Sequence, residues 1–200
     1  ICDNGACVMY PHEAPLLHSL PKDVIHQILD ACRSLSAGVP VLCGFHHIYY
    51  PENDNAAMQH EIQRYYRDPQ VVPYDDLYAV DEPILKVALC DTNGPAKESY
   101  PVMHEALGDA YELLISGDCW MDIMCKGVTK GAALQGLQER MGITPAETMA
   151  FGDYDNDISM LQHAEFSYAM ENASERVRQQ AKHIAPANTK NGVVRVLCET

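Results

Sequence analysis

Residues 151–157 read Phe-Gly-Asp-Tyr-Asp-Asn-Asp, and the rest of the chain is best interpreted outward from this stretch. The residues just before it, 148–151, are β-branched or apolar and predict a buried strand. The residues after it, 156–163, place three apolar side chains with the spacing of a short helix. The acidic cluster is therefore predicted on a strand-to-helix turn, at the carboxyl end of the strand. Open α/β sheets bind their ligands there.

The turn supplies a dense set of hard oxygen ligands from Asp153, Asp155, Asn156 and Asp157. Such a set suits Mg²⁺, which takes one or two carboxylates and keeps water or substrate phosphate for its other positions. Asp, Asn and Gly are also common turn formers, so an acidic surface turn is the structural alternative. The spacing of these residues does not decide between the two, and other parts of the chain are needed.

The composition limits the possible partners. The chain has 200 residues, 47% of them hydrophobic, which predicts a globular fold, and its net charge is −14. This charge argues against a nucleic-acid partner, and a phosphorylated ligand would need a metal ion or a placed lysine to offset its charge. No apolar run reaches membrane-spanning length, so no membrane association is expected. Eight cysteines without a C-x-x-C pair are expected as free thiols in a reducing, cytoplasmic setting.

The pattern of predicted elements changes near residue 126. Residues 126–200 alternate helices and strands, as in a doubly wound α/β sheet. Residues 11–125 predict a separate α/β insert with longer strands and hairpins, including strands at 111–115 and 120–125. Residues 1–10 predict a strand that leads into this insert. Within 126–200, we expect a helix capped by Asn172, with Val177, Ala181 and Ile184 facing inward.

Lys130 stands in the first turn of a predicted helix that Thr129 caps and that ends at Met141. Its apolar residues, among them Leu134 and Leu137, are expected to be buried. A cation in the first turn opposes the helix dipole. Such local conflicts occur at functional sites, where a lysine and a helix N-terminus together can bind a phosphate. The structural alternative is a solvated surface lysine.

His46 and His47, close to Cys43, are the other candidate metal ligands. Neighbouring residues on a strand point to opposite faces, so the two rings are not expected to share a metal ion. The tyrosines of this region are expected in the core or at its rim, rather than in a ligand site.

Taken together, three segments resemble the haloacid dehalogenase (HAD) superfamily. They are Val-Thr-Lys-Gly-Ala-Ala-Leu at 128–134, Phe-Gly-Asp-Tyr-Asp-Asn-Asp-Ile-Ser-Met-Leu at 151–161 and Ala-Met-Glu-Asn-Ala at 169–173. The branch that the chain resembles most is the Cof-type sugar-phosphate phosphatases. Asn-Gly-Ala at 4–6 and Asn-Gly-Val at 191–193 are similar to two further segments of that branch.

The resemblance implies the C-terminal part of a Rossmann-like HAD core at 126–200 and an inserted α/β cap domain at 11–125, reached through a core strand at 1–10. It implies a Mg²⁺-dependent phosphatase of a small phosphorylated metabolite, such as a sugar phosphate.

The resemblance also implies a role for each candidate site residue. Lys130 would be catalytic and would hold the phosphate. Asp153 would be catalytic and a Mg²⁺ ligand. Asn156 and Asn4 would bind substrate, and Asp157 would support the metal ion, through water.

The chain departs from the family at its nucleophile. The family's attacking aspartate is the first residue of an Asp-x-Asp-x-Thr motif, and this sequence has no such motif. We therefore expect the 200 residues to be part of a longer protein, with a missing N-terminal segment as a partner, and to have no turnover alone. Two alternatives remain open: a non-catalytic binding module derived from the HAD fold, and a HAD-type phosphomutase. The sequence does not identify the substrate or the oligomeric state.

Overall fold

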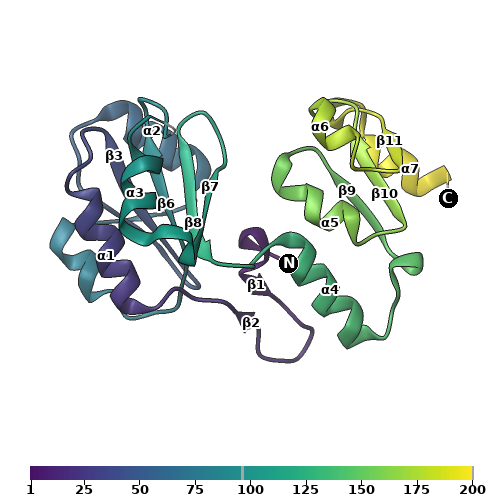
Figure 1. Cartoon of the computed structure of the whole chain (residues 1–200), viewed down its shortest axis with the longest axis horizontal. Helices are drawn as coiled ribbons and strands as arrows, with labels where there is room; N and C mark the ends of the chain where they lie inside the picture. Colours follow the sequence, from purple (N-terminus) through teal and green to yellow (C-terminus); the bar gives the residue numbers. More distant parts are fainter. Residues whose placement is uncertain (96, 200) are drawn as a thin grey trace. The chain divides into compact units, whose positions relative to one another are not determined.

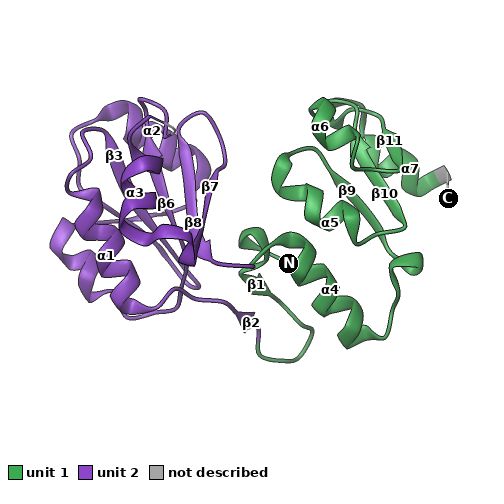
Figure 2. Ribbon diagram, viewed as in Figure 1, with its two compact units in different colours: residues 1–14, 128–200 green, residues 15–127 purple. Residues whose placement is uncertain are grey.

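The computed structural model describes residues 1–95 and 97–199 (Figure 1). The chain forms two compact units (Figure 2). Unit 1 consists of residues 1–14 and 128–200, and unit 2 consists of residues 15–127. Unit 2 is thus inserted between two segments of unit 1. In the described residues, no helix is both long enough and apolar enough to span a membrane.

Unit 2 is built on a six-stranded sheet with the order β5-β4-β3-β6-β8-β7. All neighbouring pairs are antiparallel except β4 and β5, which are parallel. The strands of the unit are β2 (Leu16–Leu17), β3 (Gly38–Gly44), β4 (Ile48–Pro51), β5 (Gln70–Val72), β6 (Ile84–Asp91), β7 (Tyr111–Ile115) and β8 (Trp120–Cys125).

Helices cover both faces of this sheet. On one face, α1 (Lys22–Cys32) and α3 (Ser99–Leu107) pack on β6 and β8 through residues such as Ile28, Met103 and Leu89. On the other face, α2 (Ala56–Tyr65) packs Met58 and Ile62 against strand residues that include Trp120. Short 3-10 turns, η2 (Tyr74–Ala79) and η3 (Gly108–Ala110), complete the unit. The sheet therefore has a hydrophobic core on each side, as two-sided burial requires.

Unit 1 contains a parallel three-stranded sheet with the order β11-β10-β9. The strands of the unit are β1 (Cys7–Val8), which is not part of this sheet, and β9 (Met149–Gly152), β10 (Phe166–Met170) and β11 (His183–Ala185), which form it. The helices of the unit are α4 (Lys130–Met141), α5 (Ile158–Gln162), α6 (Glu175–Arg178) and α7 (Gly192–Glu199). Four 3-10 turns complete it: η1 (Asp3–Gly5), η4 (Pro145–Glu147), η5 (Asp155–Asp157) and η6 (Asn188–Lys190). The mixed α/β fold agrees with the fold class expected from the sequence.

The two faces of this small sheet differ. On one face, small and aliphatic residues of the sheet and of α5 and α6, such as Ala169, Leu161 and Val177, form a tight core. On the other face, the rings of Phe151, Tyr168 and His183 stack across the three strands at centroid distances of 5.1 and 4.9 Å. Among the described residues, no strand pairs with the outer edge of β9. That edge therefore presents unpaired backbone groups.

One predicted helix is wrong. The helix expected after Asn172 exists only as α6, which Ser174 caps, and the chain then returns as strand β11. Ile184, which was expected to face inward along a helix, lies in β11 and is exposed. The pairing of β11 with β10 overrides the helical spacing of the apolar residues, because it satisfies backbone groups that a longer helix would leave at the sheet edge.

Helix α4 has its predicted bounds but not its predicted burial. Leu134 and Leu137 are only half-buried, and the Met141 residue is 62% exposed. Gln138 is buried in their place, since its amide donates to Thr148 Oγ1 (2.8 Å) and to a backbone carbonyl of α5's C-terminal turn (2.9 Å). The helical spacing of the apolar residues predicted where the helix lies, but not which of its residues are buried.

Candidate active site

The acidic turn after β9 is held closed by one of its own carboxylates. Oδ2 of Asp157 accepts hydrogen bonds from the backbone N–H groups of Asp153 (3.0 Å) and Tyr154 (3.1 Å). A Cβ on Gly152 would lie 2.5 Å from Cβ of Asp157, so a glycine is needed for this close approach. The turn therefore places the Asp153 side chain beyond the carboxyl end of β9, as the sequence predicts for this stretch.

Lys130 joins this turn from the start of α4. Its Nζ donates to Oδ1 of Asp157 at 2.5 Å, and both side chains are largely buried. The N-terminus of α4 is fixed by the Thr129 side chain, which accepts from the Ala132 backbone N–H (3.1 Å). Because both Asp157 oxygens are engaged by donors within the protein, Asp157 orients Lys130 and the turn at once.

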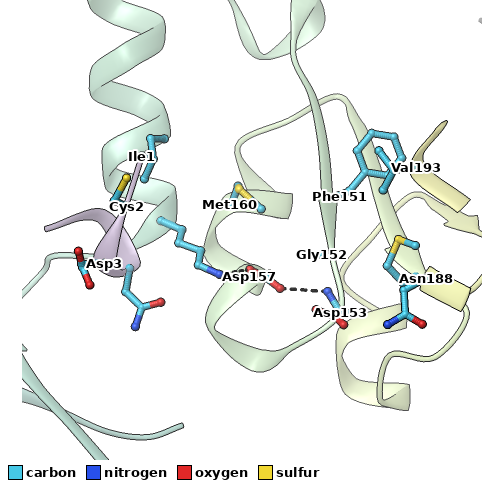
Figure 3. A pocket seen from close by; sticks show the side chains of 13 residues that line it. Ile1, Cys2, Asp3, Phe151, Gly152, Asp153, Asp157, Met160, Asn188 and Val193 are labelled. Carbon is cyan, nitrogen blue, oxygen red and sulfur yellow. Dashed lines mark hydrogen bonds and ion pairs between the residues drawn. The ribbon is translucent and has the colours of Figure 1, made fainter. Parts of the chain in front are cut away.

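Asp153 is exposed and is oriented from a different loop. The Asn172 side chain, which follows β10, donates to Oδ2 of Asp153 (3.2 Å). The Asn172 carbonyl oxygen in turn accepts from the Asn188 backbone N–H (3.0 Å). One Asp153 oxygen is thus held, and among the described residues the other accepts no hydrogen bond. Figure 3 shows the hydrogen bond that joins Asp157 to the backbone of Asp153.

Asn4 and Asn156 form a contact between the two ends of unit 1. The amide of Asn156 donates to Oδ1 of Asn4 at 2.9 Å. Asn4 sits in the left-handed region (φ 54°), beside Gly5 at φ 103°. Oδ1 of Asn156 is buried and has no hydrogen-bond partner among the described residues. A buried orphan acceptor costs about 1–3 kcal/mol, which favours a further donor at this place.

These groups surround a cavity of about 500 Å³ that is lined only by residues of unit 1 (Figure 3). Four of the five predicted site residues line it: Asn4, Lys130, Asp153 and Asp157. The fifth, Asn156, reaches it through its hydrogen bond to Asn4. The structure thus brings together the five residues to which the resemblance assigns roles, whereas Asp155 pairs with Arg176 and does not line the cavity.

The residues present fit a magnesium ion in part. The described residues contain no cluster of three or more His, Cys, Asp or Glu side chains able to hold a metal ion. Asp157 has both oxygens engaged, which leaves Asp153 and Asp3 as the other carboxylates of the cavity, and Asp153 is the one that Asn172 orients. One direct carboxylate is within the range that Mg²⁺ uses when water and phosphate supply its other ligands.

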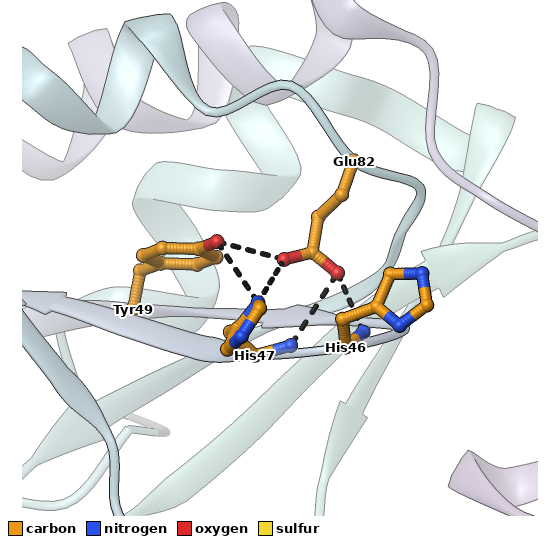
Figure 4. A network of polar contacts seen from close by, with 4 residues as sticks. All are labelled: His46, His47, Tyr49 and Glu82. Carbon is orange, nitrogen blue, oxygen red and sulfur yellow. Dashed lines mark hydrogen bonds and ion pairs between the residues drawn. The ribbon is translucent and has the colours of Figure 1, made fainter.

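The histidine pair of unit 2 is bonded to a single carboxylate, that of Glu82 (Figure 4). The Glu82 side chain, 8% exposed, accepts hydrogen bonds from the backbone N–H of His46 (2.5 Å), from His47 Nδ1 (3.1 Å) and from the Tyr49 hydroxyl (2.7 Å). Burial alone would raise the pKa of Glu82, but these bonds outweigh it and lower the pKa below its usual value. Burial, and then the bond to Glu82, raise the pKa of Tyr49 to about 12.

Sequence reasoning missed two residues of the site. Asp3 lines the cavity in a left-handed conformation (φ 45°). Asn172 was expected to be a helix cap, but it orients Asp153. The only available signal was the Ala-Met-Glu-Asn-Ala segment at 169–173, whose position after a strand marks the same edge of the sheet as residue 153.

Comparison with known proteins places the chain in a family. The sequence model of the haloacid dehalogenase-like hydrolases matches residues 1–197. The 5-amino-6-(5-phospho-D-ribitylamino)uracil phosphatase YbjI of Escherichia coli is 29% identical over 197 residues, which are 98% of this chain and 72% of that protein. A Bacillus subtilis relative of the same named activity, YitU, is 27% identical over 206 residues, which cover 98% of this chain and 73% of the relative.

A solved structure supports the same assignment. The crystal structure of TM0651 from Thermotoga maritima superposes with a TM-score of 0.84 and 29% sequence identity, over 98% of this chain and 73% of that one. The match therefore extends over both compact units, and does not depend on the acidic turn alone. The chain belongs to the haloacid dehalogenase-like hydrolases.

Proposed function

We propose that this chain provides the Mg²⁺-binding and phosphate-binding groups of a phosphatase, and that unit 2 is the cap domain that selects its substrate. The family and its named relatives make the activity a hydrolase activity on phosphorylated small molecules. The observation that carries the proposal is the convergence of Lys130 and Asp153 on one cavity, with Asp157 bonded to both the lysine and the turn.

Each residue has a role that its contacts support. Lys130 offsets the negative charge of the transferring phosphoryl group, and Asp157 positions it. Asn156 orients Asn4, whose side chain lies at the cavity wall and can bind a phosphate oxygen. Asp153 would hold Mg²⁺, oriented by Asn172. When bound, the ion supplies charge neutralisation and Lewis-acid polarisation of the phosphoryl group.

We infer that the attacking group is an aspartate outside these 200 residues, on a strand that pairs with the free edge of β9. Three features support this inference. The sequence lacks the family's Asp-x-Asp-x-Thr motif, the β9 edge is unpaired among the described residues, and the buried Asn156 acceptor lacks a donor. The aspartate oxygen would form a bond to phosphorus as the ester oxygen leaves, and water would then hydrolyse the phosphoaspartate.

The substrate that we propose is a small phosphorylated metabolite with a sugar or sugar-alcohol body. Two relatives are named for a phosphorylated ribityl compound, and this supports testing that chemistry first. A suitable panel contains 5-amino-6-(5-phospho-D-ribitylamino)uracil, several hexose and pentose phosphates, and a generic aryl phosphate.

The decisive experiment measures release of inorganic phosphate by the natural gene product that contains this sequence, with Mg²⁺ and with a chelator. We expect Asp153→Asn to lower the rate by about a hundredfold or more, since it removes a group that stabilises the transition state electrostatically. Asp155→Asn is the matched control. It removes the same charge two residues away, where the carboxylate pairs with Arg176 at 2.9 Å outside the cavity wall, and should change the rate by less than about threefold.

Two results would count against the proposal. Equal losses in the Asp153→Asn and Asp155→Asn variants would remove Asp153 from the metal site. Mg²⁺-dependent hydrolysis by residues 1–200 alone would show that the nucleophile lies within this chain. If the gene product hydrolyses none of the panel but isomerises a sugar phosphate, the phosphomutase alternative replaces the phosphatase.

A further inference from the structure

We propose that unit 2 carries a separate binding site for a small organic cation with a guanidinium or ammonium group. The site is a cavity of about 590 Å³ whose lining residues all belong to unit 2. It lies where α2 meets the start of β8, and its wall includes Glu61, Arg64, Tyr65, Asp118 and Trp120. Its size is within the range of small-molecule sites. None of these residues takes part in the proposed phosphatase chemistry.

A mostly buried carboxylate supplies the anionic group of this cavity. The Glu61 side chain is only 18% exposed. Its Oε1 accepts from Nε1 of the buried Trp120 at 3.2 Å, which fixes the orientation of the carboxylate. Its Oε2 accepts from Arg64 at 3.4 Å, which is long for a charge-assisted bond. The Cys119 thiol is a further, weak hydrogen-bond partner of Glu61. Because neither the thiol nor the long Arg64 contact is a strong cationic bond, Glu61 retains the capacity to bind a better-placed cationic donor.

An exposed aromatic ring lies next to this carboxylate. The Tyr65 residue is 60% exposed, and its ring packs edge-on against Trp120 at a centroid distance of 5.3 Å. The guanidinium carbon of Arg64 lies 5.6 Å from the Tyr65 ring centroid. Arg64 thus contacts both a carboxylate and an aromatic face, the two groups that bind organic cations in proteins. We interpret the Arg64 side chain as an internal stand-in for an external ligand of the same chemistry.

The charge of the wall favours a cation over a phosphate. Asp118 adds a second carboxylate, and the whole chain carries a net charge of −14. The Cys119 thiol lies in the same wall, and burial, followed by the nearby Glu61 charge and a side-chain hydrogen bond with Glu61, raises its pKa. The wall also contains His60 and the cationic Arg64, so its two carboxylates outnumber its permanent cations by one, which favours a cationic ligand.

The test uses the only tryptophan of the chain, Trp120, as a built-in fluorescence probe of this cavity. Agmatine, which has a guanidinium and an ammonium group, is titrated into the protein, and n-butylurea serves as the neutral analogue. We expect a saturable change in Trp120 emission with agmatine and none with n-butylurea. A linear response to both compounds, or no response to either, would overturn the proposal.

Arg64→Ala is expected to strengthen agmatine binding, although it removes a residue of the cavity wall. Because it removes the internal competitor for Glu61 and Tyr65, it should tighten agmatine binding by about two- to fivefold. Arg67→Ala is the matched control, since it removes the same charge from the same segment, where the side chain is 97% exposed and pairs only loosely with Asp68. Equal changes in both variants would mean that general electrostatics, and not this site, governs binding.

Glu61→Gln should weaken agmatine binding by about tenfold or more, because it removes the charge that accepts from the ligand. The emission of the free protein and its unfolding midpoint show whether this variant is folded. If it is not folded, the effect of Arg64→Ala on agmatine binding tests the site instead. Asp153→Asn should leave agmatine binding unchanged. Failure of the cation site and failure of the phosphatase proposal are therefore distinguishable.

Discussion

Units 1 and 2 differ in how completely their own residues cover their apolar side chains and pair their strand edges. Both faces of the unit 2 sheet are covered by helices, and its core side chains, such as Ile28, Leu89 and Ile62, are fully buried. In unit 1, one edge of the sheet is unpaired among the described residues. The side chain of Met141, the last residue of α4, is exposed. The unit with the candidate catalytic groups is thus the less complete of the two.

The buried polar groups of the two units also differ in how completely they are hydrogen-bonded. In unit 2, the buried Asp91 accepts from the Ser99 hydroxyl (2.5 Å) and from the Asn93 backbone N–H (2.9 Å), and Glu82 accepts from several donors at once. In unit 1, a buried oxygen of Asn156 has no donor among the described residues. Buried polar groups in proteins are nearly always paired, so the Asn156 oxygen is an exception among the buried side-chain groups of the described residues.

The largest effect is expected from comparing two large-to-small changes, one in each unit. Ile62→Ala removes a fully buried side chain of unit 2 and should lower its free energy of unfolding by about 2–5 kcal/mol. Met141→Ala in unit 1 should cost less than about 0.5 kcal/mol, because the side chain is exposed. Urea unfolding followed by circular dichroism reports both. A large cost for Met141→Ala would show that α4 is covered, and would break the comparison.

A smaller effect is expected from two glycine changes within unit 1. In Gly152→Ala, the new Cβ would lie 2.5 Å from Asp157, so the turn must shift, at a cost of about 1–3 kcal/mol. In Gly136→Ala, the new Cβ meets no atom within 4 Å on α4, and the change should stabilise the helix by about 0.5–1 kcal/mol. Thermal unfolding of both variants measures this difference. Equal effects would show that the acidic turn is not tightly packed.

The smallest effect concerns Glu82, whose lowered pKa makes a pH-dependent contribution to stability. A carboxylate with a lowered folded-state pKa stabilises the fold above its unfolded pKa, and this contribution is lost as pH falls through the folded value. At pH 7, Glu82→Gln should therefore cost about 1–2 kcal/mol relative to the native chain. The cost should shrink as pH falls below the ordinary glutamate pKa.

Asp81→Asn is the control for this pH dependence. It changes the neighbouring residue, whose side chain is 93% exposed and pairs with Lys22. Its effect on stability should be small and nearly independent of pH. A Glu82→Gln cost that stays constant from pH 7 to pH 3 would contradict the role assigned to the network in Figure 4.

Local sequence signals predicted much of the fold. The strands at 111–115 and 120–125 have their predicted bounds, because a turn at Ser116-Gly117-Asp118 separates two apolar runs. Helix α4 also has its predicted bounds, since Thr129 caps it and Gly142 ends it in a left-handed conformation. These signals lie within a few residues of the element they define, and so a single sequence reveals them.

The failures come from contacts between residues far apart in the chain. Apolar residues at helical spacing after residue 172 predicted a helix, but pairing with β10 made β11 instead. Likewise, the orientation of Asp153 by Asn172 joins two loops at the ends of neighbouring parallel strands, and neither loop alone indicates it. The resemblance to the HAD superfamily anticipated which side chains gather at the cavity, while the turn held by Asp157 and the part played by Asp3 required the structure.

The insertion of unit 2 has a consequence for the order of folding. Where the chain enters and leaves this unit, Cys125 Sγ lies 3.4 Å from the carbonyl oxygen of Ser19, so the folded unit holds its two ends together. An unfolded loop of more than a hundred residues in the same place would cost about 4 kcal/mol of closure entropy before the two segments of unit 1 could meet. A folded unit 2 removes most of that cost, because it already holds the two ends of the insert close together. Unit 1, which carries the candidate catalytic groups, is thus expected to assemble late, after its insert has formed.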